Sequence, residues 1–238
     1  DLEFSDANPL IVKSNIEKIV KFVFSDAYDC KITTPFQTLT YNQAMNLYGT
    51  DKPDMRIAET LLDIGDVFNG TEINFLNEIL ESGGIVKALH TEELLTRKQI
   101  DTLDEEIKEL GSNGLGWFKI QNKEISGPLA KLLNDEEKNS ILNYGTGTLL
   151  FQAGDFNSTA QYMDFIRRTI FNPSSDETFC FVWIEDFPYF EYENGELQPS
   201  HHPFTSPKDD KIFKDDPINA TALHYDLVLN GVELGSGS

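Results

Sequence analysis

The first apolar pattern in the chain is helical and begins near residue 10. Asn8-Pro9 supplies a capping residue and a first-turn proline. The stretch therefore predicts one amphipathic helix, flanked by a short strand over Asp1–Ser5 and an edge strand over Lys31–Pro35. The predicted helix carries Leu10, Ile11, Ile16, Ile19, Val20 and Val23 as its apolar set, with Lys13, Lys18 and Lys21 on other faces.

A second short helix is predicted over Tyr41–Tyr48, where Gly49 can end it. From about Ile57 the pattern changes to alternating strands and helices, which indicates an inserted domain with a sheet covered by helices on one face. Its predicted strands are Asn74–Glu78, Ile85–His90, Leu115–Gln121 and Thr148–Ala153. Its predicted helices are Thr96–Leu110, Pro128–Leu133, Asp135–Asn143 and Thr159–Ile170, the last capped by Asn157 or Ser158.

The segment from Asn172 to Ser175 is a predicted return linker, and Thr178–Ile184 is a continuously apolar strand buried on both faces. These boundaries divide the chain into residues 1–56, an insertion over 57–171, and residues 172–238. The fold class predicted from this order is α+β.

The composition argues against several classes of function. Forty acidic and nineteen basic residues leave a net charge of −21, which repels phosphate unless basic groups are segregated on one face. The chain has no apolar run of membrane-spanning length, and its first residues lack the basic start of a signal peptide. Its two cysteines, Cys30 and Cys180, have no metal-binding spacing. We therefore expect a soluble protein of a reducing cytoplasm.

The adjacent histidines His201 and His202 are the first candidate site residues. Pro203 favours an extended backbone at His202, and neighbouring residues of an extended chain point to opposite sides. The pair is thus poorly placed to chelate one ion, and we expect one histidine to face a site. The alternative is a histidine that serves only the surface or the packing.

The clearest geometric signal is an Asn-Gly dipeptide at residues 230 and 231, which marks a two-residue type I′ hairpin. With these residues at the tip, Val228 opposes Glu233 and Asp226 opposes Gly235. The carboxylates of Asp226 and Glu233 then lie on one face, with backbones roughly 7–8 Å apart. Two acids so placed suit Mg²⁺ with nucleotide phosphate, and the alternative is an exposed polar hairpin face.

Asp1 and Glu3 share a face of the predicted first strand and could add two carboxylates to a pocket. A solvent-facing edge is the alternative for this pair.

Several separate stretches together resemble bacterial-type aspartyl-tRNA synthetase. In chain order they are YNQAMNLYGTDKPDMR (41–56), LTRKQID (95–101), residues 185–190, HHPFTSPK (201–208) and YDLVLNGVELGSGS (225–238). The combination of the last two is the most specific part. The segment from about Ile57 to Phe171 is similar to the GAD insertion domain of that enzyme.

The resemblance implies a class II synthetase that forms aspartyl-adenylate from aspartate and ATP and then transfers aspartate to tRNA. Carried over by position, it implies that His201, with Asp1, contacts aspartate. It also implies that Asp226 and Glu233 hold Mg²⁺ and ATP, with Glu3 and His202 as possible pocket support. No residue is assigned a covalent catalytic role, because positioning and charge neutralisation carry this chemistry. The resemblance further implies a cytoplasmic parent that is a homodimer.

The sequence lacks counterparts of the family's anticodon-binding domain and of its motifs 1, 2 and 3, so we expect an internal fragment that is inactive alone. The first alternative is a tRNA- or protein-binding module built on the insertion. The second is a metal-dependent hydrolase that uses His201, His202, Asp226 and Glu233. The sequence does not fix whether the parent charges only the aspartate tRNA or also the asparagine tRNA.

Overall fold

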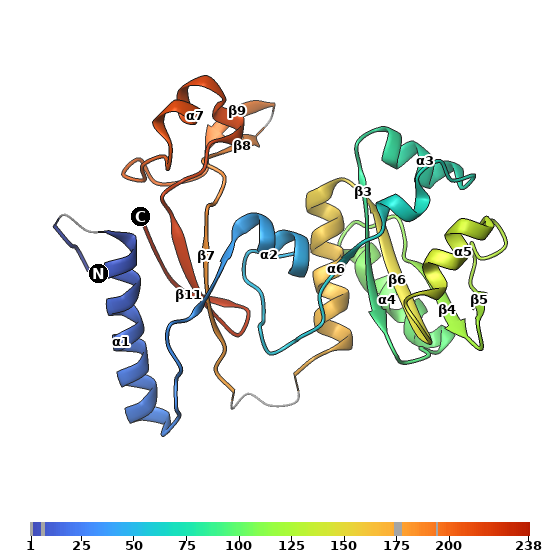
Figure 1. Ribbon diagram of the computed structural model, residues 1–238, viewed down its shortest axis with the longest axis horizontal. Coiled ribbons are helices and arrows are strands. Elements are labelled where there is room, and N and C mark those ends of the chain that lie inside the picture. The colour runs from blue at the N-terminus through green and yellow to red at the C-terminus, as the bar shows by residue number, and fades with distance from the viewer. Residues whose placement is uncertain (1, 6–7, 174–177, 194) are drawn as a thin grey trace. The chain divides into compact units, whose positions relative to one another are not determined.

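The computed structural model describes residues 2–5, 8–173, 178–193 and 195–238. They form an α+β fold, as the sequence predicts. The chain divides into two compact units (Figure 1). The first unit comprises Asp1–Gln43, Lys52–Arg56 and Ser175–Ser238, and the second comprises Ala44–Asp51 and Ile57–Ser174. None of the described helices is long and apolar enough to cross a membrane.

The first unit is built on a four-stranded sheet in the order β1-β7-β10-β11. The pairs β7·β10 and β10·β11 are antiparallel, and β1·β7 is parallel. A separate hairpin, β8·β9, precedes the histidine loop. The elements are α1 (Pro9–Tyr28), β1 (Gln37–Thr40), α2 (Tyr41–Tyr48, shared with the second unit), β7 (Phe181–Glu185), β8 (Phe190–Glu193), β9 (Glu196–Pro199), α7 (Asp210–Asp215), η2 (Pro217–Asn219), β10 (Tyr225–Leu229) and β11 (Val232–Gly237).

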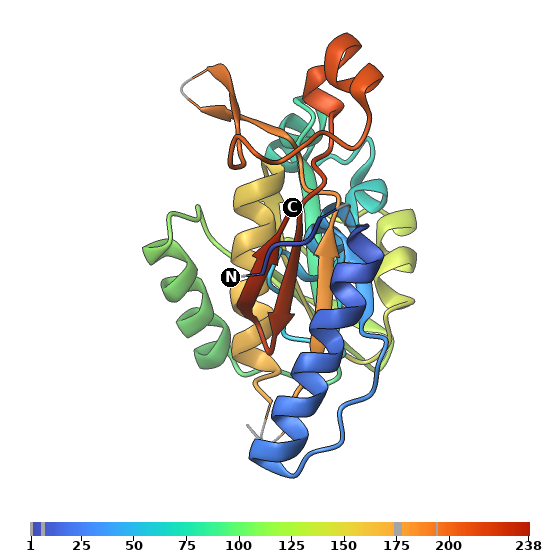
Figure 2. The same cartoon turned by 90° about the vertical axis from the view of Figure 1, so that its left-hand side faces the viewer.

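Helix α1 starts where predicted, with the Asn8 side chain accepting a hydrogen bond from the Leu10 N–H and Pro9 in the first turn. Figure 2 shows α1 lying across one face of the sheet, where Val20 packs against a core that contains Trp183. The predicted apolar face is only partly correct: Val20 and Ile16 belong to this core, whereas Leu10, Ile11, Ile19 and Val23 are exposed.

The buried face of α1 also carries two charged residues, Lys13 and Glu17, each with its own partners. Lys13 Nζ lies 2.6 Å from Glu185 Oε2. Glu17 Oε1 accepts hydrogen bonds from Trp183 Nε1 at 2.9 Å and from the Phe36 N–H at 3.1 Å. These long-range partners select the buried face of the helix, since buried charged groups require hydrogen-bonding partners.

The strands at the start of the first unit also differ from the prediction. Residues 2–5 form no strand in the part that the structure describes, and the edge strand is β1 rather than Lys31–Pro35. Helix α2 ends as predicted at Gly49, whose φ of 78° favours glycine.

The second unit is a three-layer arrangement around an antiparallel sheet in the order β2-β3-β6-β4-β5. The predicted strands at Ile85–His90, Leu115–Gln121 and Thr148–Ala153 are confirmed to within a residue or two. Its further elements are β2 (Leu62–Asp63), η1 (Gly65–Phe68), α3 (Asn74–Glu81), β3 (Ile85–Thr91), α4 (Arg97–Glu109), β4 (Gly116–Gln121), β5 (Glu124–Ser126), α5 (Asp135–Leu142), β6 (Gly147–Gly154) and α6 (Phe156–Ile170).

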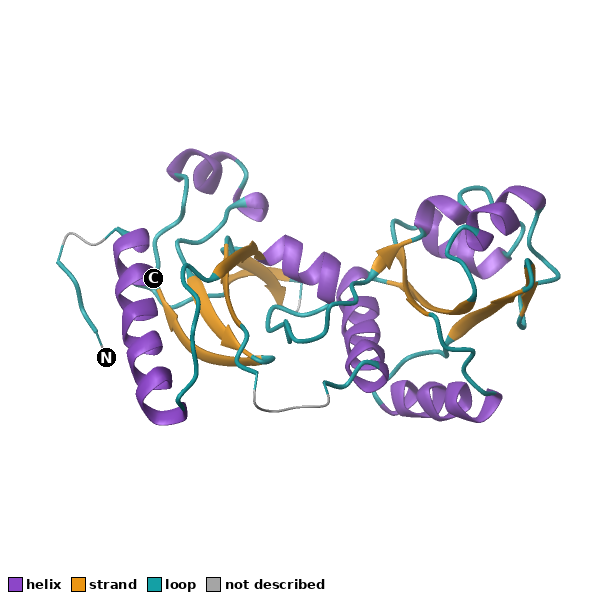
Figure 3. Ribbon diagram, turned by 60° about the horizontal axis from the view of Figure 1, so that its bottom comes forward, coloured by secondary structure: helices purple, strands orange, loops and turns teal. Residues whose placement is uncertain are grey.

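Helices cover both faces of this sheet (Figure 3). On β6, Leu149 and Phe151 point into a core shared with η1, α3 and α5, whereas Leu150 points into a core shared with α4 and α6. The predicted one-sided cover is therefore wrong. The error arises at Asn74–Glu78, which was predicted as a strand but forms the start of α3.

Two helix predictions in this unit also need correction. Residues 128–132 form turns rather than the predicted helix. Helix α6 begins earlier than predicted, because Asp155 accepts a hydrogen bond from the Ser158 N–H and is the capping residue. The predicted helix at Thr96–Leu110 is confirmed, with Thr96 and Gln99 forming a capping box.

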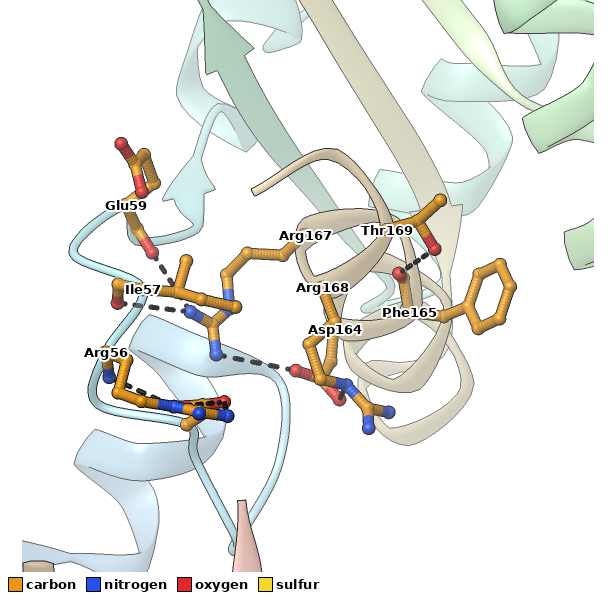
Figure 4. A network of polar contacts seen from close by, with 9 residues as sticks. Arg56, Ile57, Glu59, Asp164, Phe165, Arg167, Arg168 and Thr169 are labelled. Atoms are coloured by element: carbon orange, nitrogen blue, oxygen red, sulfur yellow. Dashed lines mark hydrogen bonds and ion pairs between the residues drawn. The ribbon is translucent and has the colours of Figure 1, made fainter. Parts of the chain in front are cut away.

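A buried arginine fastens α6 within the second unit (Figure 4). Arg167 is fully buried, and its guanidinium lies 3.6 Å from Asp164 Oδ1. It donates hydrogen bonds to the backbone oxygens of Ile57 at 3.4 Å and Glu59 at 3.3 Å, and it lies 5.1 Å from the centre of the Tyr48 ring. One side chain thus joins the helix to two other segments of the unit.

Candidate functional site

The hairpin formed by β10 and β11 carries the two candidate carboxylates. Its tip is Asn230 and Gly231, whose φ values of 50° and 83° fit the predicted type I′ turn. Val228 opposes Glu233 as predicted. Asp226, however, opposes Ser236 instead of Gly235, because an irregularity between Leu227 and Val228 shifts the register by one residue.

The bulge leaves the two carboxylates on one face. Asp226 and Val228 alternate onto the same side of β10, and Val228 is paired with Glu233. Their surroundings are different, since Asp226 is buried and Glu233 is exposed. The hairpin therefore presents one enclosed and one accessible carboxylate.

Asp226 is enclosed beside a histidine that the sequence analysis did not single out. His224 Nε2 lies 3.0 Å from Asp226 Oδ1. This contact is not a hydrogen bond, because none of the described residues donates a hydrogen bond to Oδ1. A buried carboxylate oxygen that keeps its acceptor capacity is suited to an incoming cation or donor.

His201 completes this cluster from the loop that follows β9. Its ring is half-buried and lies 4.5 Å from the His224 ring, centre to centre, at an interplanar angle of 32°. His201 Nε2 is 3.0 Å from the Pro188 carbonyl oxygen. Because a carbonyl only accepts, this contact places the proton on Nε2 and leaves Nδ1 with a lone pair. Burial, followed by the nearby charge of His224, lowers the pKa of His201 below its usual value of 6.5.

The structure separates the two adjacent histidines. His202 is exposed, and its Nδ1 accepts a hydrogen bond from the Phe204 N–H at 3.3 Å. It therefore contributes nothing to the cluster of His201, His224 and Asp226.

Glu233 has a partner in the turn between α2 and β2. Lys52 Nζ lies 3.0 Å from Glu233 Oε2, and both side chains are partly exposed. The same turn is stiffened by Asp54 and Arg56, which form an ion pair of 2.6 Å. Glu233 is thus ion-paired with a cation from this turn.

The remaining predicted pocket residues lie elsewhere. Asp1 falls outside the residues that the structure describes. Glu3 is exposed and lines a cavity of about 970 Å³ together with Trp183, Tyr225 and Leu227. By strand alternation Tyr225 and Leu227 face away from Asp226. The structure therefore does not bring Glu3 together with Asp226.

His224 could have been found from the sequence. It stands two residues before Asp226, and the period-two alternation of an extended chain places positions 224, 226 and 228 on one side. Within the described residues, no group of three or more His, Cys, Asp or Glu side chains is arranged to hold a metal ion. A divalent cation here would need oxygen atoms of a second ligand as well as the hairpin carboxylates.

The α+β fold agrees with the family comparison. The whole chain, residues 1–238, matches the family model described as tRNA synthetases class II (D, K and N). The chain therefore belongs to this family of class II tRNA synthetases.

Individual relatives narrow the comparison from the family to one kind of enzyme. The chain is 38% identical to the aspartate–tRNA(Asp/Asn) ligase of Hydrogenobaculum sp. (strain Y04AAS1), with all of the chain and 44% of the relative covered. It is 36% identical to the ligase of the same name from Caldanaerobacter subterraneus subsp. tengcongensis, and 35% identical to the aspartate–tRNA ligase of Halalkalibacterium halodurans. All of the chain and 42% of the relative are covered in both cases. The chain thus spans less than half the length of these relatives.

Proposed function

We propose that this chain is part of an aspartate–tRNA ligase, which activates aspartate with ATP and transfers it to tRNA. The main support is the 38% identity to an enzyme of that name across the whole chain. The cluster of His201, His224 and Asp226, with Glu233 on the same hairpin, supplies polar groups for binding an amino acid and a nucleotide-bound cation. The names of the relatives include both aspartate–tRNA(Asp/Asn) ligase and aspartate–tRNA ligase.

In this proposal His201 contacts the aspartate substrate. Its lowered pKa keeps the imidazole uncharged at neutral pH, and its Nδ1 lone pair can accept a hydrogen bond from the substrate ammonium. The sequence predicts that Asp1 contacts aspartate together with His201, and that Glu3 and His202 support the pocket. Glu3 and His202 lie apart from the cluster in the structure, so we assign the aspartate contact to His201.

Asp226 and Glu233 are proposed to hold Mg²⁺ together with the ATP phosphates. The residues fit such an ion, because both offer hard oxygen ligands and the buried Oδ1 of Asp226 has no aligned donor. Bound Mg²⁺ would neutralise phosphate charge. The chain itself supplies the fixed face that aligns the two carboxylates, and Lys52 beside Glu233 adds a positive charge where phosphate would approach.

The second unit is proposed to correspond to the GAD-like insertion predicted over residues 57–171, between core segments 1–56 and 172–238. Its own sheet and two cores support an independent module. Further proposals for the parent protein are tRNA as a partner, a homodimeric state and a cytoplasmic location.

The test is aspartate-dependent exchange between ATP and pyrophosphate, measured for this chain and for the full reading frame that encodes it. Each is also prepared as Glu233→Ala, with Glu124→Ala on β5 as an exposed glutamate control. We expect exchange in the long protein only. We also expect Glu233→Ala to reduce it by about 100-fold, the scale of losing one preorganised electrostatic contact, and Glu124→Ala to leave it unchanged.

Three results would contradict the proposal. Exchange that is indifferent to aspartate would exclude the amino acid assignment. Full activity of Glu233→Ala in the long protein would remove Glu233 from the ATP site. Silence of both wild-type proteins, combined with salt-sensitive tRNA retention, would favour a binding module instead.

A further inference from the structure

His224 lies between His201, the proposed aspartate contact, and Asp226, a proposed ligand of Mg²⁺. It directly precedes β10, and its side chain is 19% exposed. On one side its Nε2 lies 3.0 Å from Asp226 Oδ1. On another side its ring lies against the ring of His201, with 4.5 Å between centres. No other described side chain is recorded in contact with both His201 and Asp226.

The orientation of this imidazole is fixed by ring contacts. Phe187 presents its ring at 76° to the His224 ring, with 5.1 Å between centres. The same phenylalanine also meets His201 at 83° and 6.0 Å. Edge and offset arrangements of this kind are preferred by aromatic pairs, so the three rings hold one another in place.

The ring of His224 contacts His201, whereas its Nε2 contacts Asp226, so the two contacts can be removed separately by substitution. The ring supports His201, whose other constraint is the contact of Nε2 with the Pro188 oxygen. The nitrogen faces a carboxylate whose side chain is only 7% exposed, and a charge so buried requires a polar or charged neighbour. An apolar ring could replace only the first contact, and a flexible amide could replace only the second.

We propose that His224 is a positioning residue for both substrates: its ring orients His201 toward the amino acid, and its Nε2 orients Asp226 toward the cation-bound nucleotide. This inference rests on the proposed function of the site. It assigns no proton transfer to His224. The two halves of the proposed pocket are then coupled through one side chain.

The experiment uses the full-length protein with two variants that divide the side chain. His224→Phe keeps a ring against His201 and Phe187 and removes the nitrogen. His224→Gln keeps a polar group that can reach Asp226 and removes the ring. His90→Phe and His90→Gln, on β3 of the second unit, are the matched controls. Isothermal titration calorimetry measures the dissociation constant of aspartate without nucleotide or Mg²⁺, and that of ATP over a series of MgCl₂ concentrations.

We expect a crossed pattern. His224→Phe raises the half-saturating MgCl₂ concentration for ATP binding by about tenfold, the scale of losing a polar contact to a buried charge. It leaves the aspartate dissociation constant within about twofold. His224→Gln weakens aspartate binding by about fivefold, the scale of an aromatic pair, and changes the MgCl₂ requirement less. The His90 variants change neither quantity.

The inference is overturned if both variants shift both quantities together, since a general packing role would do that. It is also overturned if neither quantity moves in folded variants, or if His224→Phe lowers the MgCl₂ requirement. Thermal unfolding identifies a variant that does not fold. The inference is then tested with the other variant alone: His224→Phe must change only the MgCl₂ requirement, or His224→Gln mainly aspartate binding. Wild-type protein without aspartate-dependent exchange would refute the proposed function itself, whereas active wild type with unaffected variants refutes only the role of His224.

Discussion

Replacement of Arg167 by methionine is a stringent test of how the second unit is held together. The arginine is fully buried on α6, beside an Asp164 side chain that is 5% exposed. Methionine has a similar unbranched stem and therefore removes the guanidinium without opening a large cavity. The substitution leaves Asp164 with Arg168, whose Nε lies 2.8 Å from Oδ2.

The expected cost follows from these contacts. Removing one partner of a buried ion pair costs about 3–5 kcal/mol, and the remaining Arg168 contact moves the value toward the lower end. The two hydrogen bonds to the Ile57 and Glu59 oxygens are long, at 3.4 and 3.3 Å, and add about 0.5 kcal/mol each. The loss of the Tyr48 ring contact adds about 0.5 kcal/mol, which brings the total to about 4.5 kcal/mol.

Urea unfolding followed by tryptophan fluorescence measures this cost for the second unit alone. The chain has two tryptophans, and Trp183→Phe leaves Trp117 on β4 as the single reporter. At a slope of about 2 kcal/mol per molar urea, Arg167→Met lowers the midpoint by roughly 2 M. Arg168→Met, which removes a 54% exposed side chain and leaves Arg167 beside Asp164, is the matched control and is expected to cost clearly less than Arg167→Met. A loss below 1 kcal/mol for Arg167→Met, or an equal loss for both variants, would refute the reasoning.

Two further predictions use the same reporter. Burial lowers the pKa of His90 below 6.5, so as the pH falls the unfolded chain takes up this proton before the folded chain does. The stability advantage of wild type over His90→Gln therefore decreases between pH 7.5 and pH 5.5, and an increase would contradict this assignment. Gly49→Ala places a Cβ 2.3 Å from the Ala160 oxygen at a φ of 78°, whereas Gly70→Ala has a similar φ of 74° and open space. Gly49→Ala is expected to cost at least about 1 kcal/mol more than Gly70→Ala, and equal costs in urea unfolding would rule out the steric clash.

The sequence predicts elements well where local signals decide them. The capping box at Thr96 and the Asn-Gly turn at residue 230 are both local, and both are confirmed. The buried face of α1 is not local, because Lys13 and Glu17 find their partners on β7 and before β1. Apolar periodicity therefore predicted the existence and start of the helix correctly but placed only Ile16 and Val20 of its apolar set on the buried face.

In the candidate site, too, local features are predictable from the sequence, whereas contacts between distant residues are not. The alternation rule places Asp226 and Glu233 on one face, and the bulge at Leu227 changes the opposing residue without changing that face. The contact between the His201 and His224 rings joins positions 23 residues apart and depends on the path of the intervening loop. Sequence spacing gives no measure of that path, although the position of His224 relative to Asp226 was a usable signal.

The different burial of the two hairpin carboxylates determines what their substitution can report. Asp226 is buried beside His224, so its removal leaves an imidazole facing an empty polar site and disturbs β10 as well as any ligand. Glu233 is exposed, and its ion pair with Lys52 joins two partly exposed side chains, which contributes little to stability. A loss of function in Glu233→Ala can therefore be attributed to ligand binding, whereas the same loss in Asp226→Ala combines binding with the packing of the strand. For this reason the exchange assay uses Glu233→Ala, and the role of Asp226 is tested by substituting its neighbour His224.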